Sequence, residues 1–141
     1  HPHRVEKVVT LATKYEWNTA IAARETAMLQ PGKMEAKIPQ FAAQLQQRHS
    51  PGNWKTVVTK TADMLNRMGE EPPLKPADFG RINAEVLLLL GDRDKMVTLD
   101  ETVNVMKALP NAQLGVLPGA PHPLEGADAN LVAFLVKRFL G

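Results

Sequence analysis

The sequence contains no cysteine and only one serine, Ser50. Without thiols the chain can form no disulfide and can hold no metal through cysteine thiolates. No stretch approaches the length of about 18 apolar residues that marks a membrane-spanning helix, so we expect no membrane segment. Aromatic residues make up 5% of the chain, and 17 Lys and Arg nearly balance 15 Asp and Glu. Because the basic residues form no block, the composition argues against a nucleic-acid partner.

The length of 141 residues is that of one ordinary domain, which is enough to enclose a hydrophobic core. The chain begins His1-Pro2-His3 without a methionine. We therefore expect it to be part of a longer protein. The lack of cysteine is compatible with a reducing compartment, and we expect a cytoplasmic location.

The most informative stretch is residues 86–94, in which five apolar residues precede Gly91, Asp92, Arg93 and Asp94. A short, uniformly apolar run predicts a strand that is buried on both faces, as in a parallel sheet covered by helices. In open parallel sheets, functional side chains follow the carboxyl ends of the strands. Asp92 and Asp94 are therefore candidates for a functional site.

Two more strands and two helices are predicted around this run. β-Branched residues favour a strand at residues 5–13, and residues 112–117 form a third strand. A capping-box pattern at Thr98 and Glu101 predicts a helix that ends before Pro110. Apolar spacing predicts a last amphipathic helix over residues 128–140.

The segment between the first two strands has a helical pattern. Asn18 is a candidate N-cap for a helix that stops at Pro31-Gly32. A second helical stretch contains Pro39, so it is either kinked or split into two pieces with Pro39 in a first turn. A third helix carries one apolar stripe over residues 54–68.

The element order is strand, helical insertion, strand, helix, strand, helix. This order predicts a partial three-layer α/β/α sandwich, with about three parallel strands and a helical insertion outside the sheet. We expect residues 1–17 to form a core strand and its flank, residues 18–76 the helical insertion, and residues 77–141 the rest of the core.

Asp94 follows the second strand and His122 follows the third. Parallel neighbouring strands end at the same edge of a sheet, so we expect these two side chains to meet there. A carboxylate can orient an imidazole and stabilise its charged form, as a hydrolytic triad requires. Pro121 and Pro123 restrict the loop around His122, which suits a side chain that must keep one position. Asp94 and His122 are therefore the candidate catalytic residues.

Residues 82–141 resemble the C-terminal half of an α/β-hydrolase. The resemblance rests on GDRD after an apolar strand, a capped helix, the stretch LPNAQLGVLPGAPHPLE and a closing amphipathic helix. The segment HRVEKVVTLATK resembles the strand after the nucleophile helix, and residues 18–68 resemble the variable helical cap. The resemblance implies that Asp94 is the acid and His122 the base of a triad that hydrolyses small ester-like substrates, without a cofactor or metal.

The sequence departs from this family because it has no G-x-S-x-G nucleophile elbow. Its one serine, Ser50, lies in a His-Ser-Pro-Gly loop without the elbow pattern. The chain thus has two of three triad members. We expect it to be inactive alone, because an oriented His–Asp pair has no attacking group to activate.

Each assignment has an alternative. Asp94 could cap local amides, Asp92 is expected to accept backbone hydrogen bonds at its turn, and His122 could be an ordinary loop histidine. Trp54, Met64 and Met68 could be core residues of the helical insertion or could line an apolar acyl-binding site. The loop of Asp92 and Asp94 offers few oxygen ligands for a divalent cation.

Two other functions compete with a hydrolase. One is an α/β binding domain whose acidic residues hold Mg²⁺ or a phosphorylated partner, and the other is a non-catalytic adaptor domain. Contact between Asp94 and His122 favours the hydrolase, whereas wide separation favours the others.

The resemblance also implies that the first strand would pair with a neighbour that this sequence does not contain. A bare strand edge recruits other chains. We therefore expect a homodimer that forms through this edge or through exposed apolar surface.

Overall fold

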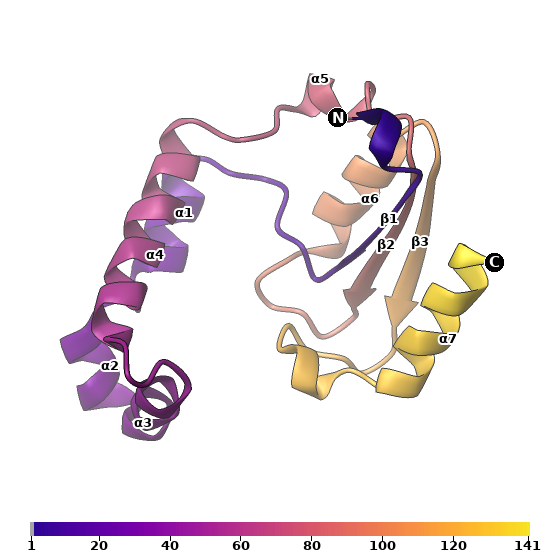
Figure 1. The fold of residues 1–141 in the computed structure, drawn as a ribbon. Coiled ribbons are helices and arrows are strands. Elements are labelled where there is room, and N and C mark those ends of the chain that lie inside the picture. The colour runs from indigo at the N-terminus through magenta and orange to yellow at the C-terminus, as the bar shows by residue number, and fades with distance from the viewer. Residues whose placement is uncertain (1) are drawn as a thin grey trace. The chain divides into compact units, whose positions relative to one another are not determined.

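The computed structural model of the chain describes residues 2–141 (Figure 1). The chain divides into two compact units. The residues up to Tyr15, together with Leu74–Gly141, form one unit, which we call the sheet unit. Glu16–Pro73 form the other, which we call the helical unit.

The sheet has three strands in the order β1-β2-β3, and both neighbouring pairs are parallel. The strands are β1 (Lys7–Leu11), β2 (Glu85–Gly91) and β3 (Ala112–Leu117). The predicted open parallel sheet is therefore confirmed. β1 is shorter at both ends than the predicted residues 5–13. At its carboxyl end, Ala12 adopts a positive φ of 50°, which ends the extended conformation.

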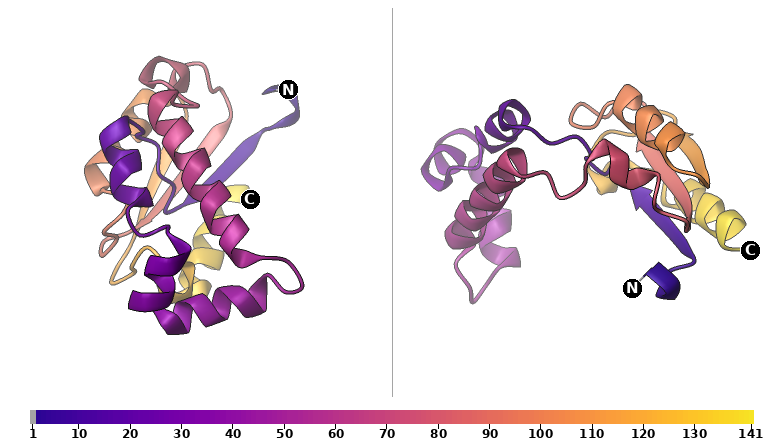
Figure 2. Two further views of the ribbon diagram at one scale, coloured as in Figure 1. Left: turned by 90° about the vertical axis from the view of Figure 1, so that its left-hand side faces the viewer. Right: turned by 90° about the horizontal axis from the view of Figure 1, so that it is seen from above.

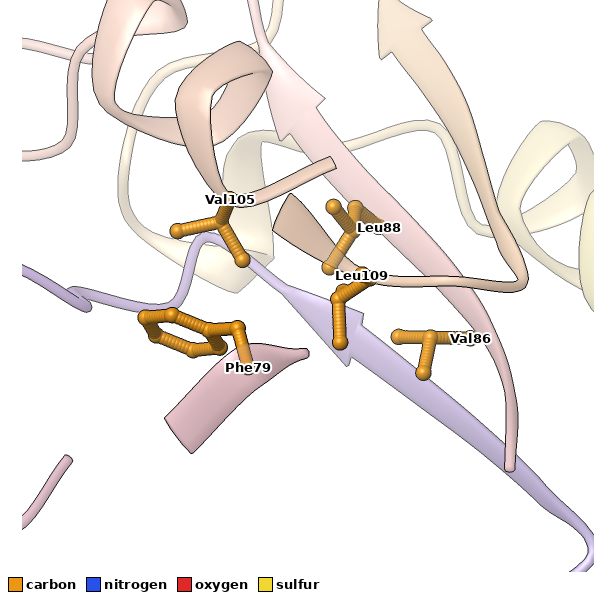
Figure 3. Close-up of a cluster of buried hydrophobic side chains, with 5 residues drawn as sticks. All are labelled: Phe79, Val86, Leu88, Val105 and Leu109. Atoms are coloured by element: carbon orange, nitrogen blue, oxygen red, sulfur yellow. The ribbon is translucent and has the colours of Figure 1, made fainter. Parts of the chain in front are cut away.

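The central strand β2 is buried on both faces over Val86–Gly91, as its apolar run predicted. Alternate side chains of a strand point to opposite faces of the sheet. Val86 and Leu88 accordingly join one core cluster with Phe79, Val105 and Leu109 (Figure 3). Leu87 and Leu89 join a second cluster with Phe139 on the other face.

Helices of the sheet unit supply both clusters. The unit contains α5 (Pro76–Phe79), α6 (Leu99–Ala108) and α7 (Ala129–Leu140), and α6 and α7 cover opposite faces (Figure 2). Two short 3₁₀ turns, η1 (Pro2–Arg4) and η2 (Leu124–Gly126), complete it.

Local capping explains where these helices begin. The Asp128 carboxylate accepts hydrogen bonds from the backbone N–H groups of Asn130 and Leu131 at the start of α7. α5 is a short helix that the sequence analysis did not predict. It forms because Pro76 suits a first helical turn and the Asp78 carboxylate accepts a 2.8 Å hydrogen bond from the Lys75 backbone N–H.

The helical unit contains four helices: α1 (Thr19–Thr26), α2 (Pro31–Lys37), α3 (Pro39–Arg48) and α4 (Trp54–Glu70). Asn18 is the N-cap of α1, as predicted, and its side chain accepts from the Ile21 backbone N–H. The prediction that a helix stops at Pro31-Gly32 is wrong, because α1 ends at Thr26 and Pro31 opens α2. Pro39 likewise opens α3, so the second helical stretch is split into two helices rather than kinked.

The helical unit has its own core of Met34, Ala42, Trp54 and Val58. A Cβ added at Gly69 of α4 would lie 2.5 Å from the Ala22 Cβ and 2.9 Å from the Asn18 carbonyl oxygen. The absence of a side chain at Gly69 therefore permits the close approach of α1 and α4.

We propose that the outer edge of β1 is a self-association surface. Within residues 2–141, β1 pairs with β2 alone, so its other edge offers backbone groups to another strand. Sedimentation of a concentrated sample is expected to give the mass of a dimer that dissociates on dilution. A monomer mass over the whole concentration range would contradict this prediction.

Candidate active site

The loops after β2 and β3 are joined by hydrogen bonds at the carboxyl edge of the sheet. The Asp92 backbone N–H donates to the Leu117 carbonyl at 3.2 Å, and the Arg93 N–H donates to the Ala120 carbonyl at 3.1 Å. The Asp92 carboxylate accepts a 2.6 Å hydrogen bond from the Gly119 N–H. Asp92 therefore accepts a backbone hydrogen bond, as predicted, and it links the two loops.

Gly91 makes this contact between loops possible. A Cβ built on Gly91 would lie 2.0 Å from the Ala120 carbonyl oxygen and 2.7 Å from its carbonyl carbon. No side chain fits at such distances, so the end of β2 can lie against the loop after β3 only with glycine at this position.

The carboxylate of Asp94 makes different contacts through its two oxygens. Oδ1 accepts hydrogen bonds from the backbone N–H groups of Met96 and Val97, both at 2.8 Å. Oδ2 lies 2.9 Å from Nδ1 of His122, and the Asp94 side chain is 0% exposed. Asp94 thus caps the turn with Oδ1 and makes the predicted contact with His122 through Oδ2.

Burial raises the pKa of Asp94, but hydrogen bonds from Val97, His122 and Met96 outweigh it and hold the pKa below its ordinary value. The carboxylate is therefore ionised at neutral pH and can only accept hydrogen bonds. The proton in the contact must then reside on Nδ1 of His122, which leaves Nε2 of a neutral imidazole as the basic nitrogen. The His122 side chain is 32% exposed.

The lowered pKa of Asp94 predicts a pH-dependent stability. A group with a depressed pKa in the folded state contributes stability above its unfolded pKa, and this contribution is lost as the pH falls through the folded pKa. The gap in unfolding free energy between the native chain and Asp94→Asn is expected to be constant near neutral pH and to shrink below about pH 4. Urea unfolding at several pH values measures this gap. Asp100→Asn, at an exposed position, controls for the change in net charge.

The three predicted substrate-lining residues all lie on α4 in the helical unit. Trp54 is 3% exposed and belongs to the core of that unit, whereas Met64 is 45% exposed. Trp54 and Met64 are ten residues apart on this helix, so their Cα atoms are about 15 Å apart. Trp54 therefore does not lie together with Met64 and Met68. Their role in lining an acyl site stays a prediction.

Within residues 2–141, no three His, Asp or Glu side chains lie close enough to hold a metal ion. None of the helices in that range is both long enough and apolar enough to cross a membrane.

Glu101 has a role that the sequence did not reveal. Of the two hydrogen bonds in the predicted capping box, the structure has the one that the Glu101 backbone N–H donates to the Thr98 hydroxyl at 3.1 Å. The Glu101 carboxylate accepts hydrogen bonds from the Tyr15 backbone N–H at 2.6 Å and from Lys14 Nζ at 2.7 Å. These partners lie more than 80 positions away in the chain, so no local pattern indicates them.

Comparison with known proteins gives a consistent picture of the fold. No protein-family profile matches the chain. Over 64 residues it is 34% identical to a protein of Synechocystis sp. (strain ATCC 27184 / PCC 6803 / Kazusa) named "putative non-heme chloroperoxidase", a match that covers 45% of this chain and 23% of that protein.

Similar solved structures match nearly the whole chain. A thermophilic esterase from Thermogutta terrifontis is 16% identical with a TM-score of 0.63, over 99% of this chain and 57% of its own. A 2-hydroxy-6-oxo-6-phenylhexa-2,4-dienoate hydrolase from Rhodococcus sp. strain RHA1 is 17% identical with a TM-score of 0.64. This match covers 99% of this chain and 56% of the hydrolase. An α/β hydrolase from a Medee basin deep-sea metagenome is 15% identical with a TM-score of 0.65. This match covers 100% of this chain and 58% of that hydrolase.

The chain thus spans less than two thirds of the length of each of these proteins. Together with the parallel sheet and the helices on its two faces, the structural matches show that the chain has the α/β-hydrolase fold.

Proposed function

We propose that the chain is the C-terminal portion of an α/β-fold hydrolase that cleaves ester or related acyl bonds. In this proposal, Asp94 is the acid and His122 the base of a nucleophile–His–Asp triad. The observation that carries the proposal is the 2.9 Å contact between Asp94 Oδ2 and His122 Nδ1.

The chemistry of this pair fits general-base catalysis. With Nδ1 donating to an ionised carboxylate, Nε2 of His122 can take the proton of an attacking hydroxyl. The imidazolium that forms is stabilised by the Asp94 carboxylate beside it. Hydrogen bonds from Met96 and Val97 hold this carboxylate in place, so it need not reorganise when the charge appears.

The nucleophile of the proposed triad would come from outside this sequence. The chain contains no G-x-S-x-G elbow, and it spans little more than half of the hydrolase structures that it resembles. The names of two of those structures, an esterase and a dienoate hydrolase, support hydrolysis as the reaction class, and the first supports an ester as the bond cleaved. They do not favour one substrate over the other, because one fold hosts many activities.

Hydrolysis of p-nitrophenyl acetate tests the proposal in two steps. The 141-residue chain alone is expected to give the same rate as its His122→Ala variant. A longer polypeptide that extends upstream through a nucleophile elbow is expected to hydrolyse the ester, and His122→Ala in it should lower kcat by about 10³-fold or more. Replacing His49, which lies in the loop after α3, serves as a matched control and should leave the rate unchanged.

Two outcomes would overturn the proposal. Ester hydrolysis by the 141-residue chain that depends on His122 would mean that the chain holds its own nucleophile. Full activity of the longer polypeptide after His122→Ala would remove His122 from the role of base and would favour the alternative of a non-catalytic binding or adaptor domain.

A further inference from the structure

A second group of buried polar side chains lies where the chain leaves β1. The carboxylate of Glu101 in α6 is hydrogen-bonded to the Tyr15 backbone N–H and to Lys14 Nζ. The Glu101 side chain is 2% exposed and that of Lys14 is 12% exposed. Tyr15 is the last residue of the sheet unit before the helical unit begins at Glu16.

The segment that returns from the helical unit reaches the same place. Phe79 of α5 lies edge-on to the Tyr15 ring, with 6.1 Å between ring centroids, and it packs in the core cluster with Val105 of α6. The Tyr15 hydroxyl lies 2.6 Å from the Thr10 hydroxyl of β1. Tyr15 and Phe79 therefore both pack against other parts of the sheet unit.

The charged contact in this group is costly to break because it is buried. Removing one member of a buried ion pair leaves an uncompensated charge, which costs far more than the loss of an exposed pair. The 2.6 Å bond from the Tyr15 N–H also holds the backbone itself. Glu101 thus holds a segment of irregular structure through both a side chain and the backbone.

The same helix is joined to the candidate active site. α6 begins at Leu99, directly after the turn in which Asp94 accepts hydrogen bonds from Met96 and Val97. Val97 is also buried, so its side chain anchors this turn in the core. A displacement of the first turn of α6, which contains Glu101, would be transmitted to Asp94 through only a few residues.

We propose that Glu101 is a positioning residue: it binds the Lys14–Tyr15 segment that follows β1 to the first turn of α6, and so steadies the preceding turn, which holds Asp94 against His122. The proposal rests on the proposed function only in that Asp94 and His122 are taken as the catalytic pair. The tie itself is a property of the sheet unit and can be measured without any catalytic assay.

Amide hydrogen exchange and imidazole ¹⁵N NMR of the 141-residue chain test this inference. In Glu101→Ala, exchange of the Tyr15 amide is expected to accelerate about 10-fold to 100-fold, as on loss of a hydrogen bond to a charged acceptor. The ¹⁵N shifts of His122 are expected to move away from those of the Nδ1–H form. Asp100→Ala, in the same helical turn at an exposed position, should change neither signal.

One double variant guards against loss of folding. Glu101→Gln keeps an oxygen for the Tyr15 N–H, and combining it with Lys14→Met removes the charge that would otherwise stay buried. This double variant is expected to restore the His122 spectrum and most of the Tyr15 protection.

Each contrary result has one meaning. Unchanged Tyr15 exchange in Glu101→Ala would show that Glu101 does not hold the segment. Faster Tyr15 exchange with an unchanged His122 spectrum would reduce Glu101 to a structural contact and overturn its positioning role. Neither result depends on ester hydrolysis, so failure of the inference and failure of the proposed function are distinguishable.

Discussion

Replacing Asp94 with asparagine is expected to reverse the tautomer of His122. An asparagine amide turned with its oxygen toward the Met96 and Val97 N–H groups presents its NH₂ group to His122. Nδ1 must then accept a hydrogen bond, so the proton moves to Nε2. An imidazole in this state cannot act as a base through Nε2. In the proposed hydrolase, kcat would fall by about 10⁴-fold.

Imidazole ¹⁵N NMR of the 141-residue chain measures this reversal directly. Asp94→Asn should change the signals of His122 from an Nδ1–H to an Nε2–H form. Its free energy of unfolding should fall by about 2 kcal/mol, because hydrogen bonds to a charged acceptor are replaced by bonds to a neutral one.

Asp92→Asn is the matched control, because it alters a neighbouring carboxylate that accepts from the Gly119 N–H. The spectrum of His122 should not change in this variant. An unchanged His122 tautomer in Asp94→Asn would contradict the assignment of the proton to Nδ1.

Replacing Gly91 with alanine is expected to cost about 3 kcal/mol of unfolding free energy, at the upper end of the range for overpacking. The new Cβ would overlap the Ala120 carbonyl group, which is backbone and cannot rotate away as a side chain could. The end of β2 and the loop after β3 would have to separate. Because Asp94 and His122 extend from these two segments, their contact should weaken with them.

Urea unfolding and the His122 imidazole spectrum measure both effects in the same sample. Gly80→Ala is a suitable control in the sheet unit, since an added Cβ there meets nothing closer than 4.0 Å. We expect Gly80→Ala to leave the stability nearly unchanged. Equal stabilities for the two variants would show that the close approach at Gly91 is not a structural requirement.

Residues 86–94 show how far local sequence reaches. Five apolar residues predicted a strand that is buried on both faces, and β2 is buried along Val86–Gly91. Asn18 and the Thr98 hydroxyl cap their helices as predicted, because an N-cap depends only on residues within one turn. Proline was less informative, since Pro31 can follow the end of one helix and open the next.

Local sequence patterns did not predict the contacts between distant segments. The hydrogen bond that the Tyr15 N–H donates to the Glu101 carboxylate joins residues 86 positions apart, and nothing near Glu101 in the sequence indicates it. The capping-box spacing even suggested another use for the same carboxylate. Sequence reasoning also offered capping and catalysis as rival roles for Asp94, whereas the structure has one contact on each oxygen.

The sequence by itself determined the parallel α/β architecture and the presence of an acid and an imidazole after adjacent strands. Strand burial follows from local runs of apolar residues, and parallel order follows from the alternation of strands and helices along the chain. Only the tertiary structure decided that Asp94 Oδ2 lies 2.9 Å from His122 Nδ1 and that Gly91 lies against Ala120. These distances depend on how two loops pack against each other across the sheet. Such packing is set by the whole fold rather than by either segment.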